Sequence, residues 1–74
     1  MQIIDARGHR CPVPTLKLQK ALAGLAPGEE VRLLADDPMA RIDVPHFADG
    51  AGHEVVSTED QEAGAVAFTV RKRA

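Results

Sequence analysis

Two prolines separated by one residue, Pro12 and Pro14, stand directly before an amphipathic helical pattern. Proline is tolerated in the first turn of a helix, because the N–H groups there have no helical partner, and it is unfavourable further in. The apolar side chains that follow recur at helical spacing, at Leu18, Ala21, Leu22 and Leu25. Together these features predict an amphipathic helix over residues 12–24, which must begin close to its prolines.

The rest of the chain alternates between strand and helix patterns. We expect a helical turn near Ala40 and a separate short helix over residues 45–51, because Pro45 breaks the interior of a helix. A polar turn containing Gly64 indicates a hairpin of the last two strands. The strands are predicted at residues 2–5, 30–35, 53–58 and 65–71.

This βαβαββ order predicts an α/β fold of the α+β type. We expect a two-layer sandwich in which two helices pack on one face of a mixed four-stranded sheet. The first two strands are expected to be parallel, joined by a right-handed crossover. All 74 residues fit a single small domain, residues 1–74, with only a few kcal/mol of net stability.

Charge and hydropathy exclude several classes of protein. A formal net charge of −2 gives no general attraction to phosphate backbones, so direct DNA binding is not expected. No apolar stretch approaches the roughly 20 residues that cross a bilayer, so we expect no membrane segment. The chain has one cysteine and no secretory pattern, which favours a reducing, cytoplasmic setting. We expect a monomer.

Polar loops follow both of the strands predicted to be parallel. One loop carries Arg10, Cys11 and Pro12, and the other carries Asp36 and Asp37. Loops that follow parallel strands collect at the carboxyl edge of a sheet, where such sheets usually bind or react. We therefore expect the thiol and the two carboxylates to lie toward the same edge.

The thiol of Cys11, at the predicted helix start, is a candidate nucleophile. The helix N-terminus and the neighbouring Arg10 favour the thiolate, with the Val13 N–H as the principal free amide near the sulfur if Cys11 is the N-cap. Carboxylates of Asp36 and Asp37 close to the sulfur would oppose this by raising the thiol pKa. We predict a modest net lowering of the pKa of Cys11.

Other interpretations of these residues stay open. Cys11 could be a structural hydrophobe, and Asp36 and Asp37 could cap the next helix instead of acting as an acid pair. A dithiol redox site is excluded, because no second cysteine exists. His46 and His53 show no metal-ligand spacing with the cysteine, so we expect neither a metal nor another cofactor.

Several motifs resemble those of the TusA (SirA-like) sulfur-carrier family, over nearly the whole chain. They are Gly8-x-Arg10-Cys11-Pro12-x-Pro14, Ala35-Asp36-Asp37-Pro38 and Asp43-Val44-Pro45 with Phe47. The resemblance implies the same βαβαββ sandwich and a sulfurtransferase component that carries sulfur as a persulfide on Cys11. The sulfur would come from a donor such as a cysteine desulfurase and pass to an acceptor protein, ending in 2-thiouridine of tRNA.

The same resemblance leaves other endpoints open, because members of this family also serve molybdenum-cofactor assembly, sulfur oxidation or selenium metabolism. A transient protein interface is expected around Cys11, with contributions from Arg10, Pro12, Pro14 and Lys17. The alternative function is a noncatalytic regulatory or adaptor domain in which Cys11 is structural.

Overall fold

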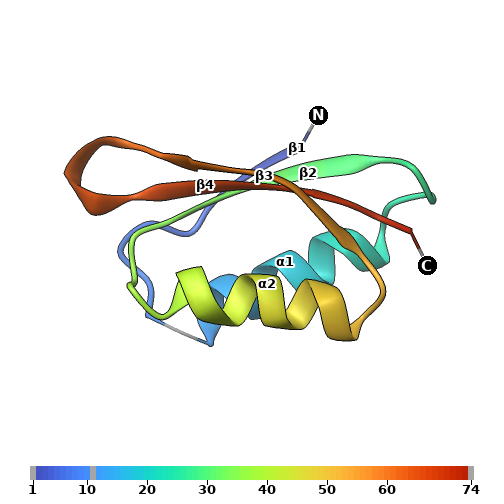
Figure 1. Ribbon diagram of the computed structural model, residues 1–74, viewed down its shortest axis with the longest axis horizontal. Helices are drawn as coiled ribbons and strands as arrows, with labels where there is room; N and C mark the ends of the chain where they lie inside the picture. The colour runs from blue at the N-terminus through green and yellow to red at the C-terminus, as the bar shows by residue number, and fades with distance from the viewer. Residues whose placement is uncertain (1, 11, 74) are drawn as a thin grey trace.

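The computed structural model describes residues 2–10 and 12–73, which form a sheet and a layer of helices covering one of its faces (Figure 1). This confirms the predicted two-layer fold and the predicted order of elements. The elements are β1 (Gln2–Asp5), α1 (Val13–Ala23), β2 (Glu30–Ala35), α2 (Ala40–Gly50), β3 (Glu54–Asp60), the 3-10 turn η1 (Glu62–Gly64) and β4 (Val66–Arg71).

The four strands lie in the order β1-β2-β4-β3. β1 and β2 are parallel, whereas β4 is antiparallel to both of its neighbours, so the predicted parallel pair and terminal hairpin are confirmed. Strand β3 runs two residues further than predicted, and its pairing with β4 shifts between Val55 and Ser57. Such a bulge increases the local twist of an edge strand.

The core lies between the sheet and the helices. Strand β2 alternates between buried and half-buried side chains, as expected for a strand with one face on the core. The largest side chain in the core is Phe68, and burying a side chain of this size contributes about 1.5–3 kcal/mol. The other large buried side chains are Pro14, Leu18, Leu22, Val31, Leu33, Val44, Val66 and Val70.

Helix α1 begins one residue later than its prolines suggest. Pro12 occupies the N-cap position, and Val13 is the first helical residue. The conditional assignment of Cys11 as the N-cap is therefore wrong. The start of the helix is shifted because the Val13 N–H donates to the carbonyl of Arg10, 2.9 Å away, and closes a turn before the helix proper.

Helix α2 is continuous, and the predicted division into a turn and a short helix is wrong. Pro45 lies inside it and leaves the carbonyl one turn earlier without its usual partner. Ala40, Val44 and Ala48 recur four residues apart and are all buried. Packing of this stripe against the sheet outweighs the cost of the proline, which is about 3 kcal/mol in a helix interior.

Candidate functional site

The loops after β1 and β2 meet at one end of the molecule, on the left in Figure 1. They border a groove of about 550 Å³, called here the carboxyl-end groove, because it lies where the two parallel strands end. This confirms that the two loops converge. The groove is lined by Gly8, His9, Arg10, Asp36, Asp37, Pro38 and Met39.

Cys11, the predicted catalytic residue, lies outside the described residues. The chain on either side of it is described: Arg10 lines the carboxyl-end groove, and Pro12 is exposed at the start of α1. The sequence neighbours of the thiol therefore stand at the end of the molecule where the two loops meet. The predicted lowering of its pKa stays a prediction.

The backbone around the helix start differs from the expectation in one respect. The N–H of Val13 donates to the carbonyl of Arg10, 2.9 Å away, and the N–H of Leu16 donates to the carbonyl of Pro12, also 2.9 Å away. Because the Val13 amide already has an acceptor, it is not the free amide predicted beside the sulfur. The Val13 amide is therefore not available to a thiolate in the way that the sequence indicated.

Two arginines lie near the groove, and they differ in their interactions with other side chains. Arg7 donates to both carboxylate oxygens of Asp5, at 2.9 and 2.8 Å, and holds the pKa of that carboxyl far below its usual range. The guanidinium of Arg10 is exposed and has no hydrogen bond or ion pair among residues 2–10 and 12–73. Arg10 is therefore the cation that remains available to a thiolate or to a partner.

Asp36 joins the two loops. Its Oδ1 accepts a hydrogen bond from the N–H of Gly8, 2.9 Å away, across 28 residues of sequence. Gly8 has a φ of +86°, a backbone conformation that side chains with a Cβ disfavour. The glycine of the motif therefore shapes the loop that leads toward the thiol.

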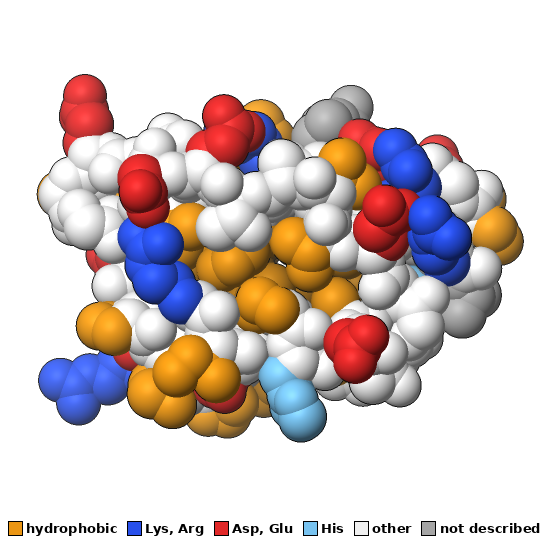
Figure 2. Space-filling view, viewed as in Figure 1, with side chains coloured by type: hydrophobic (Ala, Val, Ile, Leu, Met, Phe, Trp, Pro, Cys, Tyr) orange, Lys and Arg blue, Asp and Glu red, His pale blue; other side chains and the backbone are white. Residues whose placement is uncertain are grey.

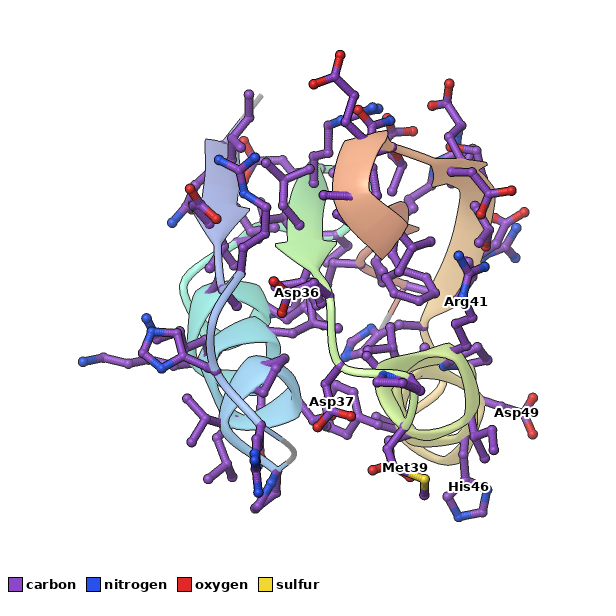
Figure 3. The ribbon with its side chains drawn as sticks, turned by 90° about the vertical axis from the view of Figure 1, so that its left-hand side faces the viewer. Asp36, Asp37, Met39, Arg41, His46 and Asp49 are labelled. Carbon is purple, nitrogen blue, oxygen red and sulfur yellow. The ribbon has the colours of Figure 1, made fainter. Side chains whose placement is uncertain are left out.

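Asp37 organises the turn that leads into α2. Its Oδ1 accepts a hydrogen bond from the N–H of Met39, 3.0 Å away, and its carbonyl accepts one from the N–H of Ala40. In Figure 3, Asp36 lies beside the end of β2, whereas Asp37 lies between the starts of the two helices. The N-cap of α2 is Met39, with no side-chain cap hydrogen bond, so the expectation that Asp36 and Asp37 cap this helix is wrong. The Asp37 carboxylate instead holds the turn before the helix, and the alternative of an acid pair stays untested.

Two residues expected on the interface lie elsewhere. Pro14 is buried in the core, so it supports the helix start from within instead of offering a surface to a partner. Lys17 is exposed, but it borders a different hollow of about 400 Å³ between β1 and α1, not the carboxyl-end groove. That hollow is lined by Gln2, Ile4, Lys17, Lys20, Ala21 and Gly24.

Exposed apolar side chains at the starts of both helices were missed by the sequence reasoning. Leu16 is 55% exposed, Met39 49% and Ile42 63%, and Val13 is also exposed. Figure 2 shows hydrophobic side chains gathered at the lower left, over the start of α2. Their signal in the sequence is that they fall off the buried stripes of their helices. We call Val13, Leu16, Met39 and Ile42 the apolar rim.

No helix in the described part of the chain is long and apolar enough to cross a membrane. Residues 2–10 and 12–73 also hold no group of three His, Asp or Glu side chains arranged to bind a metal ion.

Comparisons with known proteins agree with these features. A model of the TusA sulfurtransferase family matches residues 2–72. The sulfur carrier protein TusA of Pseudomonas paraeruginosa is 40% identical over 72 residues, which are 97% of this chain and 90% of that protein. The protein of the same name from Pseudomonas putida is 38% identical over 97% of this chain and 89% of its own.

A solved structure shows the same architecture. The crystal structure of a SirA-like protein from Desulfitobacterium hafniense superposes with a TM-score of 0.88 at 31% sequence identity, covering all of both chains. The match of the family model and the identity to its members extend over almost the whole chain. This chain therefore belongs to the TusA sulfurtransferase family.

Proposed function

We propose that this chain is a sulfur carrier in which Cys11 accepts sulfur as a persulfide from a donor protein and passes it to an acceptor protein. Membership of a family whose relatives are named sulfur carriers supports the role. The observation that carries the assignment to Cys11 is that the chain's only cysteine stands between Arg10, which lines the carboxyl-end groove, and the exposed Pro12.

The transfer needs no change in the overall oxidation state. The Cys11 thiolate attacks the terminal sulfur of a donor persulfide, a new S–S bond forms at Cys11, and the donor's S–S bond breaks. The electron pair of the broken bond leaves on the donor thiolate. Delivery repeats the step in reverse roles, because the acceptor thiolate attacks the terminal sulfur on Cys11 and releases the carrier thiolate.

Electrostatics at the groove act in two directions on such a thiolate. Arg10 is an exposed cation next to Cys11 in sequence and favours the charged form. The carboxylates of Asp36 and Asp37 line the same groove and oppose it. We propose that Arg10 outweighs them, because both carboxylates already accept hydrogen bonds from backbone N–H groups.

The apolar rim supports transfer between proteins. Met39 lines the groove, and the other exposed hydrophobic side chains at the two helix starts can be covered together with it in a short-lived complex with a donor or acceptor. We propose a cysteine desulfurase as the donor and a thiol-bearing relay protein as the acceptor. We also propose the cytoplasm as the compartment, because a reducing setting keeps a lone thiol available.

Loading with a cysteine desulfurase, pyridoxal phosphate and cysteine tests this function. Intact-protein mass spectrometry of the wild type is expected to show additions of about 32 Da per sulfur atom. The matched control is Cys11→Ser, which should melt like the wild type and remain unmodified. A wild type that takes up no sulfur, or a Cys11→Ser variant that takes up as much, would contradict the assignment.

The endpoint of the pathway needs a separate measurement. We propose 2-thiouridine of tRNA as the destination, and a strain lacking this chain should lose that nucleoside. Wild type should restore it and Cys11→Ser should not. An unchanged 2-thiouridine content in the deletion strain would contradict this endpoint and favour cofactor assembly, sulfur oxidation or selenium metabolism instead.

A further inference from the structure

The loop between β1 and α1, residues 6–10, is tied to the rest of the fold at few points. At its start, the buried Ala6 donates its N–H to the carbonyl of Leu34, 2.8 Å away. Further along, the N–H of Gly8 donates to Oδ1 of Asp36, 2.9 Å away. The other hydrogen bonds recorded for the described part of this loop are local. Asp36 is thus the side chain that anchors the middle of the loop.

Asp36 is attached to a well-packed part of the sheet. Asp36 directly follows Ala35, the fully buried last residue of the central strand β2. Its partner Gly8 adopts a φ of +86°, and a Cβ built there would meet no atom within 4 Å. The loop therefore needs glycine for its backbone conformation and not for space, and that conformation turns the Gly8 N–H toward the carboxylate.

We infer that Asp36 is a positioning residue, which holds the loop in the conformation that presents Cys11 to its protein partners. The inference rests on the proposed sulfur-carrier function. Asp36 acts through Gly8, three residues before Cys11, and contributes as a hydrogen-bond acceptor. Its negative charge is not the useful feature, because a carboxylate near the sulfur raises the thiol pKa and so disfavours the nucleophile.

Two variants distinguish the role of Asp36 as a hydrogen-bond acceptor from the effect of its negative charge. Asp36→Ala removes both, and we expect sulfur uptake by Cys11 to fall about tenfold, since small misplacements of a reacting group cost rate steeply. The Gly8 amide should also exchange faster with solvent. Asp36→Asn keeps an oxygen acceptor and should stay within about twofold of the wild type. Its Cys11 thiol pKa, from alkylation rates against pH, should equal or lie below that of the wild type.

The matched control is Asp60→Ala, which removes another exposed aspartate whose partner is Arg41 of α2 instead of the loop. It should load at the wild-type rate, and thermal melts should show that all three variants are folded. Wild-type uptake and exchange in Asp36→Ala would overturn the inference. So would a loss in Asp36→Asn equal to that in Asp36→Ala, since the charge would then be the active feature.

The experiments distinguish a failure of the proposed sulfur-carrier function from a failure of the inference about Asp36. A wild type that takes up no sulfur contradicts the carrier function, whereas amide exchange at Gly8 and alkylation of Cys11 require no sulfur donor. These two measurements therefore still decide the role of Asp36. Faster Gly8 exchange in Asp36→Ala, together with slower alkylation at a pH at which the thiol is fully ionised in every variant, would support positioning if Asp36→Asn restores both. Unchanged values in Asp36→Ala would overturn it.

Discussion

The two ends of the sheet are held in different ways. At the end away from the carboxyl-end groove, Arg71 of β4 pairs with Glu30 of β2 and Glu54 of β3, at 2.8 and 3.3 Å. Arg73 adds a further ion pair to Glu54, and these four residues are called here the ion-pair cluster. At the groove end, among residues 2–10 and 12–73, the hydrogen bond from the Gly8 N–H to Asp36 ties the loop before Cys11 to the loop after β2, whereas the ion pair of Arg7 with Asp5 is local.

Backbone hydrogen bonds strengthen the same contrast. The N–H of Gly28 donates to the carbonyl of Lys72, and the N–H of Lys72 donates to the carbonyl of Glu29, at 2.7 and 2.8 Å. These bonds fasten the C-terminal segment to the turn before β2. We expect stability to depend mainly on the end with the ion-pair cluster, and the proposed reactivity of Cys11 to depend on the other end, where fewer long-range bonds hold the loop. Substitutions at the two ends should therefore separate the two properties.

The largest expected effect comes from a matched pair of glycines, Gly8 and Gly28. Both have a positive φ, +86° and +93°, and both have open space where a Cβ would be. Alanine at either position should cost about 1–2 kcal/mol in backbone strain, a large part of the stability of so small a domain. Only Gly8→Ala should also slow sulfur uptake by Cys11. Chemical denaturation and loading rates measure the two effects.

The same two variants test whether stability and sulfur uptake depend on different ends of the sheet. Equal slowing of uptake in Gly28→Ala and Gly8→Ala would mean that reactivity follows overall stability, and the two ends would not be separable. Gly24→Ala is a further control, because Gly24 has a negative φ and a Cβ there would meet its nearest atom at an ordinary 3.6 Å. It should be stable and react normally.

A smaller effect is expected from Arg71→Gln, which removes the central cation of the ion-pair cluster. The melting temperature should fall at low salt and fall less at high salt, because partly exposed ion pairs are screened. Sulfur uptake should be unchanged. Arg41→Gln, which breaks a single exposed pair with Asp60, should lower the melting temperature less. A loss of uptake in Arg71→Gln would contradict the separation of the two ends.

The smallest expected effect is a pH dependence of stability. The hydrogen bond from Arg73 lowers the folded-state pKa of Glu54 below its ordinary value of 4.5. The carboxylate thus contributes stability that is fully present above pH 4.5 and is lost as the pH falls through the lower folded-state value. Glu54→Gln should be less stable than the wild type at pH 7, and the difference should shrink in acid. A constant difference would exclude this linkage.

Much of the fold could be predicted from local patterns. Alternation and helical spacing identified every strand and the first helix, and the parallel order placed the loops of Gly8 and Asp36 at one edge. The prediction of α2 was wrong at Pro45. The proline preference accounts for one lost hydrogen bond, but it does not include the stabilisation from the stripe of buried side chains on the same helix. Pro14 was wrongly expected on the interface, because the burial of its side chain depends on residues from other parts of the chain that pack against it.

The candidate site could also be predicted only in part. The proposed reactive group could be chosen from the sequence, since Cys11 is the only thiol of the chain, and this residue lies outside the described residues. The Val13 amide could not be assigned, because its acceptor, the carbonyl of Arg10, depends on how the turn closes. The apolar rim was also missed. Its residues fall off the buried stripes of their helices, but only the packing of the helices brings the two helix starts to the same end of the molecule (Figure 1).

Local patterns in the chain are enough to predict the order of the elements and the chemistry available, because periodicity, proline geometry and the number of thiols are local properties. The packing of distant segments explains why Asp36 holds Gly8, why Lys17 lies away from the groove and why the ion-pair cluster lies at the other end. Each of these depends on groups far apart in the sequence. Their distances are set when the two layers pack around a common core.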